Sequence, residues 1–542
     1  MDEISFETHP SRYRHLKFEA GADRAQLTLK VEETGGLRPN YLLKLNSYDL
    51  SVDIELADAV NRLRFEHPGV SVVTITGAID GIFCAGANIF MLASSGHGFK
   101  VNFCKFTNET RLAIEEASEE SGQRYVAALN GTTSGGGYEL ALACDEILLV
   151  DDRRSVVSLP ELPFLGVLPG TGGLTRMVDK RKVRRDLADV FSTLAEGVRG
   201  ERAVKWGLVD ALLARSRFNE LLEKRINELV ACAEPGRAGR SGVVLDALEP
   251  SSTEDEIRYR HLTLKLDRRR RLAELLVAGP ERVEPIPEHS TALSADWYPL
   301  RLFREIDDAL LRLRFNYPEI GVVLVRSSGD LRRVLELERA VYERRNDYFV
   351  KETLLLIKRA LKRMDLTAKS FFTLVEPDSC FGGFLFELAL ASDRCYMSTG
   401  RAAQIATGLL NRGALPMGNG LSRLRTRFLG QPDYADRLAS ERVYNAEEAF
   451  EAGLVTAIPD ELDWEGEIRL AVDERLSLSP DGLTGMEANL RFPGPETMET
   501  KIFARLSAWQ NWIFQRPNAV GPRGALKLYG QPERPEFDWA RT

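Results

Sequence analysis

Short blocks of apolar residues with two different spacings run along the first half of the chain. Between residues 52 and 65 the apolar positions recur at the spacing of an amphipathic helix. The run 70–76 is rich in β-branched residues and ends at Gly77, which predicts a strand. Further strands are expected at 42–45, 125–129 and 146–150, and a helix at 138–144. This alternation predicts an α/β fold with parallel strands and helical crossovers.

The same pattern returns about 250 residues further along the chain. The echoed segments are 48–50 with 298–300, 61–68 with 311–318, 136–145 with 384–393, and 206–210 with 452–456. Matches in one order at nearly constant spacing predict a tandem duplication of one module. The second copy keeps Glu387 where the first has Glu139, but it has about Gly408 in place of Glu161. It also lacks a counterpart of the small-residue turn at 84–87, so we expect it to be degenerate.

Composition then suggests where the domains meet. Residues 179–271 are expected to be mostly helical, and the proline-rich, charged stretch after them is expected to be a linker. The predicted domains are a catalytic module with its helical region (1–277), a linker (278–290), the degenerate module (291–470) and a helical, aromatic C-terminal extension (471–542).

Charge and composition narrow the function classes. The net charge of −8 argues against a nucleic-acid partner. No apolar run is long enough to span a membrane, and the acidic start lacks the apolar core of a secretory signal, so we expect a cytoplasmic protein. The six cysteines and six histidines show no metal-ligand spacing, so we expect reduced thiols and no metal.

The candidate chemistry lies in a glycine-rich segment and two acids. Gly136 opens a predicted helix, where backbone N–H groups lack intrahelical partners and the helix dipole favours negative charge. Ala87, in the turn after a strand, can supply a second N–H donor. Two carboxylates in one apolar pocket push each other's pKa apart, so Glu139 and Glu161 can divide the roles of base and acid. The sequence does not say which residue has which role.

These motifs, in this order, resemble the crotonase (enoyl-CoA hydratase/isomerase) superfamily over residues of about 40 to 275. The matching segments are 83–89, 130–131, 135–141, 160–161, 169–173 and 203–209. The resemblance implies the spiral ββα fold of that superfamily, an oxyanion hole from Ala87 and Gly136, and Glu139 and Glu161 as acid/base pair. It also implies a group of substrate-contacting residues, namely Ala85, Gly86, Asn88, Gly135, Tyr138 and Gly170.

Two departures bear on the pocket. The family often has Asp where Asn88 stands. One extra residue, near Pro163 and Phe164, separates Glu161 from Gly166, which predicts a reshaped pocket wall.

The full chain, duplication included, resembles the ring-opening branch of the superfamily that acts in aerobic benzoyl-CoA degradation. This implies hydrolysis of 2,3-epoxybenzoyl-CoA, or its oxepin isomer, with two waters to formate and 3,4-didehydroadipyl-CoA semialdehyde. No cofactor is expected, because CoA is part of the substrate. An ordinary 2-enoyl-CoA hydratase or isomerase is the alternative enzyme, and a non-catalytic CoA- or RNA-binding scaffold is the alternative of another class. We expect a homodimer.

Overall fold

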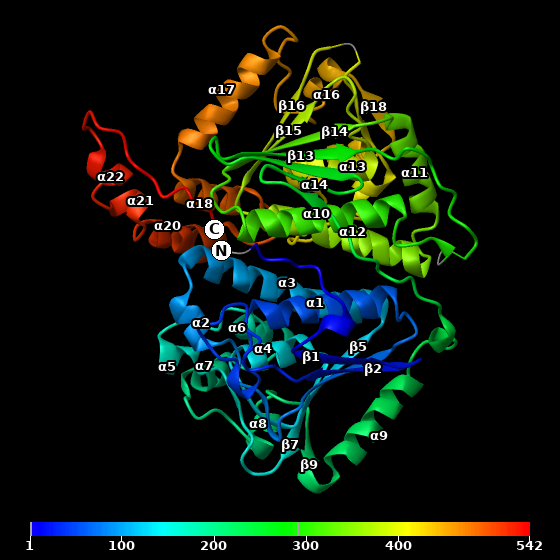
Figure 1. The fold of residues 1–542 in the computed structure, drawn as a ribbon, viewed down its shortest axis with the longest axis vertical. Helices are drawn as coiled ribbons and strands as arrows, with labels where there is room; N and C mark the ends of the chain where they lie inside the picture. Colours follow the sequence, from blue (N-terminus) through cyan, green and yellow to red (C-terminus); the bar gives the residue numbers. More distant parts are fainter. Residues whose placement is uncertain (1–2, 290–291, 401) are drawn as a thin grey trace. The chain divides into compact units, whose positions relative to one another are not determined.

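The computed structural model describes residues 3–289, 292–400 and 402–542 (Figure 1). It contains two compact units. The first unit is Phe6–Ala247, and the second is Leu248–Thr542 together with the N-terminal residues up to Ser5. The unit boundary therefore precedes the predicted one at 277/278. The predicted boundary at 290/291 lies outside the described residues.

The first unit is built on two sheets. The larger sheet has the order β1 (Leu16–Ala20), β2 (Arg24–Leu29), β3 (Val72–Gly77), β5 (Arg124–Leu129), β7 (Glu146–Asp151) and β9 (Ala211–Ala214). Only β1 is antiparallel to its neighbour. The smaller parallel sheet consists of β4 (Gly81–Cys84), β6 (Gly131–Ser134) and β8 (Val157–Ser158). Strand-to-strand crossovers thus bring the ends of β4, β6 and β8 together.

Helices cover both faces of the larger sheet. The helices of this unit are α1 (Leu50–Phe65), α2 (Ile89–Ser94), α3 (His97–Ser121), α4 (Gly136–Ala143), α5 (Glu161–Leu165), α6 (Gly173–Thr175), α7 (Arg185–Thr193), α8 (Gly200–Lys205) and α9 (Phe218–Ala231). Leu222 and Ile226 of α9 pack on one face against residues such as Val126. Helices α1 and α3 lie on the other face, as Figure 1 shows.

The second unit has its own mixed sheet. Its order is β10 (Ser251–Ser252), β11 (Glu256–Arg258), β12 (Leu262–Asp267), β13 (Leu272–Ala278), β14 (Val322–Ser328), β15 (Ser370–Val375) and β16 (Arg394–Met397). β10 to β13 are antiparallel, and β13 to β16 are parallel. β17 (Ile405–Thr407) and β18 (Arg442–Tyr444) form a separate two-stranded antiparallel sheet, although helices lie between them in the sequence.

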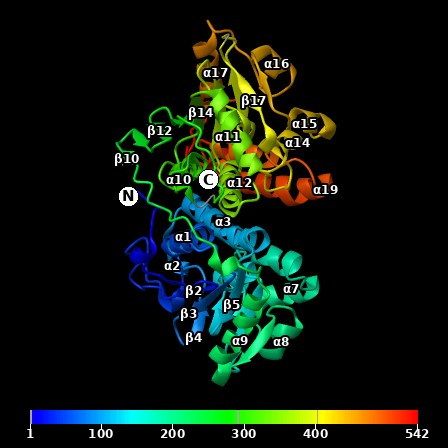
Figure 2. The same cartoon turned by 90° about the vertical axis from the view of Figure 1, so that its right-hand side faces the viewer.

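Helices again cover this sheet. They are α10 (Tyr298–Phe315), α11 (Leu331–Glu343), α12 (Tyr348–Leu366), α13 (Gly383–Ala391), α14 (Arg423–Arg427), α15 (Pro432–Leu438), α16 (Ala446–Glu451) and α17 (Trp464–Ser477). Trp464 and Ile468 of α17 pack against Phe372 and Leu374 of β15. Helix α11 packs against α13 and runs beside β17 (Figure 2).

The C-terminal region of the second unit continues as short helices. They are α18 (Pro480–Leu490), α19 (Met498–Thr500), α20 (Ser507–Ile513), α21 (Pro517–Val520) and α22 (Ala525–Leu528). The predicted boundary at 470/471 falls inside α17, whose apolar face belongs to the core of the second unit.

Several predicted elements are confirmed, and two are wrong. The helix at 52–65 and the strands at 70–76, 125–129 and 146–150 appear as α1, β3, β5 and β7. The strand expected at 42–45 is absent from the described residues, because Leu45 and Asn46 have positive φ in a short turn. The helical expectation for 179–271 fails at β9 and from residue 251 onward. The residues of β12 alternate between buried leucines and more exposed positions, which is the two-residue period of a strand. The expected linker begins inside the second unit.

Within the described part of the chain, no helix combines the length and apolar character needed to cross a bilayer.

Candidate active site

The Ala85–Ala87 turn lies directly against the start of α4. Gly86 has a φ of +88°, and a Cβ placed on it would lie 2.7 Å from the carbonyl oxygen of Ser134 and 2.9 Å from the nitrogen of Gly136. Only glycine permits this approach. The predicted oxyanion donors, Ala87 and Gly136, are therefore on neighbouring backbone segments. The N–H of Gly136 is in the first turn of α4, where no intrahelical acceptor exists.

Tyr48 connects these two segments. Its backbone N–H donates to the carbonyl of Gly86 at 3.0 Å, and its carbonyl accepts from the N–H of Asn88 at 2.8 Å. Its hydroxyl lies so close to Gly136 that a Cβ there would be 1.9 Å from the oxygen. Burial raises the pKa of Tyr48, so the hydroxyl keeps its proton.

A buried arginine supports the same arrangement. Arg111 donates to the hydroxyl of Tyr48 at 3.2 Å and to the carbonyl of Gly136 at 3.4 Å. Its charge is paired with Asp53 at 3.2 Å, and Thr107 donates to the same carboxylate. Sequence reasoning did not single out Tyr48 or Arg111 as functional. The repeat of Tyr48 at Tyr298 was the only signal, and nothing in the sequence connected Arg111 to α4.

Glu139 is buried in the first turn of α4, with 2% of its surface exposed. Its Oε1 accepts from the N–H groups of Thr171 at 2.9 Å and Gly173 at 2.8 Å, and the hydroxyl of Thr171 donates to Oε2. A Cβ on Gly173 would lie 2.9 Å from Cγ of Glu139. The turn at 169–173, one of the segments behind the resemblance, therefore holds this carboxylate in a fixed orientation.

Glu161 is the less constrained of the two acids. It begins α5, and its Oε1 approaches Gly135 so closely that a Cβ there would lie 2.7 Å away. Its Oε2 is buried without a hydrogen-bond partner among the described residues. Burial and the nearby charge of Glu139 raise the pKa of Glu161 to about 7. A carboxyl with this pKa can both accept and return a proton near neutral pH.

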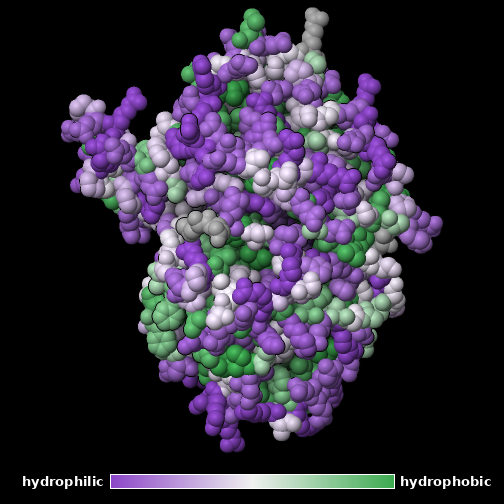
Figure 3. Space-filling model, in the orientation of Figure 1, coloured by the Kyte–Doolittle hydropathy of each residue, from purple (hydrophilic) through white to green (hydrophobic). Residues whose placement is uncertain are grey.

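Apolar side chains flank the two acids. Phe90 of α2 is 73% exposed and Phe164 of α5 is 68% exposed. Further exposed apolar residues follow in the same segments, namely Ile89, Leu162, Leu165, Val167 and Leu168. Figure 3 shows hydrophobic surface on the flank where Figure 1 labels α2 and α5. The extra residue after Glu161 is part of the single-turn helix α5, which ends at Gly166 with a φ of +63°.

Gly170 lies beside a cysteine that sequence reasoning treated only as a reduced thiol. A Cβ on Gly170 would be 3.2 Å from the Sγ atom of Cys104. Burial, together with the charges of Glu139 and Asp53, raises the pKa of Cys104 to about 11. The thiol is therefore protonated at neutral pH.

Two predicted substrate-contacting residues are directed elsewhere. The ring of Tyr138 is fully buried against Phe191, and its hydroxyl donates to the carbonyl of Leu208 at 2.8 Å. One step along a helix rotates the side chain by about 100°, so Glu139 faces the site while Tyr138 faces the core. The amide of Asn88 caps α2 and donates to the carbonyl of Leu42 at 2.7 Å. Asn88 thus holds the turn that carries Ala87. Ala85 is exposed on that turn.

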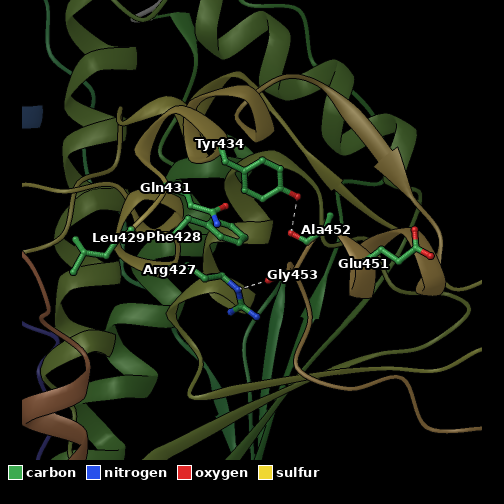
Figure 4. A pocket seen from close by; sticks show the side chains of 9 residues that line it. Arg427, Phe428, Leu429, Gln431, Tyr434, Glu451, Ala452 and Gly453 are labelled. Atoms are coloured by element: carbon green, nitrogen blue, oxygen red, sulfur yellow. Dashed lines mark hydrogen bonds between the residues drawn. The ribbon is translucent and has the colours of Figure 1, made fainter.

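A depression of about 490 Å³ lies in the second unit, around α14, α15 and the end of α16 (Figure 4). Within it Arg427 donates to the carbonyl of Gly453 at 2.6 Å, and Tyr434 donates to that of Ala452 at 3.1 Å. None of the predicted site residues lines it. Across the described ranges, no group of three or more His, Cys, Asp or Glu is arranged to hold a metal ion.

Comparison with known proteins shows which class of protein the first unit resembles. Residues 40–264 match the family model of enoyl-CoA hydratase/isomerase. The fatty acid oxidation complex subunit alpha of Shewanella loihica is 33% identical over 36% of this chain and 26% of its own length. A crystal structure of an enoyl-CoA hydratase from Geobacillus kaustophilus HTA426 is 32% identical, with a TM-score of 0.36, and the match covers 40% of this chain and 75% of that one. The first unit therefore contains a domain of the crotonase class.

The match that spans the whole chain is more specific. Benzoyl-CoA-dihydrodiol lyase of Aromatoleum evansii is 51% identical over 544 residues, which cover 99% of this chain and 98% of that protein. The chain belongs to the benzoyl-CoA-dihydrodiol lyase family.

Proposed function

We propose that this protein is a lyase that opens the ring of 2,3-epoxybenzoyl-CoA, in its epoxide or oxepin form. Two waters are consumed, and the products are formate and 3,4-didehydroadipyl-CoA semialdehyde. One observation carries the proposal: Glu161 lies against Gly135, next to Gly136, and is close enough to Glu139 for that charge to raise its pKa, in a chain that matches a benzoyl-CoA-dihydrodiol lyase over nearly its full length.

The oxyanion donors act on the thioester carbonyl. The ring is conjugated with this carbonyl, so negative charge drawn to its oxygen makes the ring carbons electrophilic to water. Ala87 and Gly136 supply the N–H groups, and the dipole of α4 adds to their effect. Tyr48 and Arg111 act as positioning residues, because they contact the backbone of Gly136 while Tyr48 also binds the turn that carries Ala87.

The two glutamates move the protons. Glu161 takes a proton from the attacking water, since its pKa of about 7 and its free Oε2 suit a base near neutral pH. Glu139, held by Thr171 and Gly173, keeps a fixed orientation towards the reacting atoms. The exposed aromatic residues Phe90 and Phe164 offer an apolar flank for the ring. This net hydrolysis needs no further cofactor.

The test is formate release from 2,3-epoxybenzoyl-CoA. The parent protein should release formate, and Glu139→Gln and Glu161→Gln should each lower kcat by about 10²–10⁴. Glu119→Gln, at an exposed position of α3, is the matched control and should retain activity. Hydration of crotonyl-CoA without formate would make the protein an ordinary hydratase. Failure to bind any CoA thioester in a calorimetric titration would favour the scaffold alternative.

The second unit is proposed to be a degenerate copy of the first module. Helix, strand, helix, strand, helix and strand follow one another as α1, β3, α3, β5, α4 and β7 in the first unit and as α10, β14, α12, β15, α13 and β16 in the second. This shared order supports the duplication indicated by the sequence repeats. We further propose a cytoplasmic homodimer, which sedimentation equilibrium would test.

A further inference from the structure

The second unit holds a buried carboxylate at the start of α13. Glu338 projects from α11 and is 1% exposed. The N–H of Phe384 donates to its Oε2 at 2.5 Å, and the N–H of Leu410 donates to its Oε1 at 3.1 Å. A carboxyl group therefore lies at the N-terminus of a buried helix, where it is bound by backbone donors from two separate segments.

This location corresponds to the oxyanion donor of the first unit. Because Glu387 aligns with Glu139, Phe384 is the counterpart of Gly136, and Gly383 is the counterpart of Gly135. Both glycines have a positive φ, +52° at Gly135 and +49° at Gly383. The turn that presents the N–H is thus retained in the second unit, although the first unit's other donor segment is not.

Two glycines leave room for this carboxylate. A Cβ on Gly383 would lie 1.5 Å from Oε2 of Glu338, and a Cβ on Gly408 would lie 2.0 Å from Oε1. Gly408 lies at about the sequence position that Glu161 has in the first unit. Helix α11, which carries Glu338, follows β14 where the first unit has β4 and the Ala85–Ala87 turn after β3. Near this point the second unit therefore has a glutamate that comes from a different element.

We propose that Glu338 is a built-in ligand of the remnant site formed by Gly383, Phe384, Gly408 and Leu410. Its carboxylate occupies the N–H of Phe384, the counterpart of the Gly136 N–H that is proposed to face the thioester oxygen in the first unit, so the second unit takes no CoA thioester. Shortening Glu338 opens a site for a small carboxylate. The inference rests on the proposed duplication, and it does not depend on which reaction the first unit catalyses.

The small carboxylate that should bind a shortened variant can be chosen from the atoms that the substitution removes. Glu338→Ala deletes a CH2–COO⁻ group, which has the size and charge of acetate. The two N–H donors are then left buried without an acceptor, which destabilises the folded state. Acetate supplies the missing acceptor and binds the folded state alone, so it raises Tm in a saturable way.

The experiment compares Glu338→Ala with Glu336→Ala, an exposed glutamate of the same helix. Calorimetric Tm is measured against increasing sodium acetate, with sodium chloride at equal ionic strength as the reference. We expect Glu338→Ala to lose about 5–10 °C and to regain much of this with acetate. Benzoate, which is too large for the deleted volume, should give no recovery. Formate release at a temperature below the transition should stay within about twofold of the parent.

Two results would overturn the inference. One is a Tm for Glu338→Ala equal to that of Glu336→Ala, and the other is an equal response to acetate and chloride. If Glu338→Ala does not fold, Glu338→Asp replaces it, because the shorter side chain draws the carboxyl group away from the two N–H groups. An unchanged Tm in that variant would equally contradict the assignment. If the parent protein releases no formate, only the proposed function is refuted, and the inference about Glu338 is unaffected.

Discussion

Glu139 and Glu161 share one site, but their surroundings give them different freedom. Glu139 receives hydrogen bonds on both oxygens from the 171–173 segment. Glu161 has one oxygen near Gly135 and one without a partner among the described residues. These contacts support the proposed roles, in which Glu161 exchanges protons and Glu139 keeps a fixed orientation.

The pH dependence of the reaction should follow Glu161. A base must be ionised, and the pKa of Glu161 is raised to about 7 by burial and by Glu139. Below pH 7 we expect kcat/KM for formate release to rise about tenfold per pH unit, and above pH 7 to level off. The bend should be absent in the residual activity of Glu161→Gln. A profile that falls through pH 7 would give Glu161 the role of acid instead.

The same pKa makes a prediction for stability. A carboxyl whose pKa is higher in the folded chain than its reference of 4.5 favours folding when protonated. This contribution is present below pH 4.5 and is lost as pH rises towards 7. Glu161→Gln, which is always neutral, should therefore be more stable than the parent by about 2–3 kcal/mol at pH 8 and about equal to it at pH 4.5. Urea denaturation at both pH values measures this, with Glu119→Gln as the unaffected control. A gain independent of pH would contradict it.

At the scale of single residues, the sequence predicted which backbone groups form the candidate site better than it predicted the contacts of the side chains. Gly86 and Gly136 could be predicted, because their lack of a Cβ is a property of the residue itself. The direction of Tyr138 could not, because both Tyr138 and Glu139 are on α4 and only the packing of Phe191 decides which one faces the core. The roles of Tyr48 and Arg111 depend on contacts between distant segments, which local spacing does not contain.

At the scale of elements, α4 and α13 each carry a buried glutamate at an equivalent position, but the two glutamates have different contacts. Glu387 of α13 accepts from Asn411 at 2.7 Å and from Arg423 at 3.1 Å, and Arg423 also pairs with Asp365 at 2.6 Å. The side chains of all three charged groups are at most 2% exposed. The glutamate that faces the site in α4 thus helps to join α12, α13 and α14 in the second unit.

This difference predicts opposite phenotypes for equivalent substitutions. Glu387→Gln removes one partner of a buried arginine and should lower the free energy of unfolding by about 2–4 kcal/mol, with kcat unchanged. Glu139→Gln should lower kcat by the factor given above, with a smaller effect on stability. Chemical denaturation and formate release measure the two effects on both variants. A loss of kcat in Glu387→Gln would place catalysis in the second unit as well.

Helices and strands were predicted correctly where the apolar residues follow a single clear spacing. α1, β3, β5 and β7 were predictable because each has a clear helical period or a run of buried β-branched and apolar residues. β10 to β13 were missed because the basic run at 268–271 between β12 and β13 indicated a solvated helix face. In the structure it is the loop of a hairpin, in which Leu262 pairs with Val277.

At the scale of the whole molecule, two related units should give one substrate site per chain. The first unit holds the candidate oxyanion donors and both acids, and in the second the equivalent N–H already binds Glu338. Titration calorimetry with benzoyl-CoA should therefore give a stoichiometry of one per chain, and Glu161→Gln should keep it. A value of two would require an open site in the second unit. A value of one half would indicate a site completed by two copies.

The duplication was visible in the sequence, but the unit boundary was not. Repeated motifs can indicate a duplication however far apart the two copies lie in the sequence. A proline-rich segment such as 278–287 predicts only a local lack of regular structure. The division at 247/248 is set by β10 to β13, which extend the sheet of the second unit and therefore belong to it.

Under the proposed duplication, Gly408 and Glu338 set the order in which catalytic residues could return to the second unit. Restoring a glutamate there would place its Cβ 2.0 Å from the carboxylate of Glu338, and the new charge would face an existing one. A single reversion is therefore worse than none, and the route back to a two-site enzyme requires Glu338 to change first. The same order applies to a designer who wishes to give this chain a second catalytic centre.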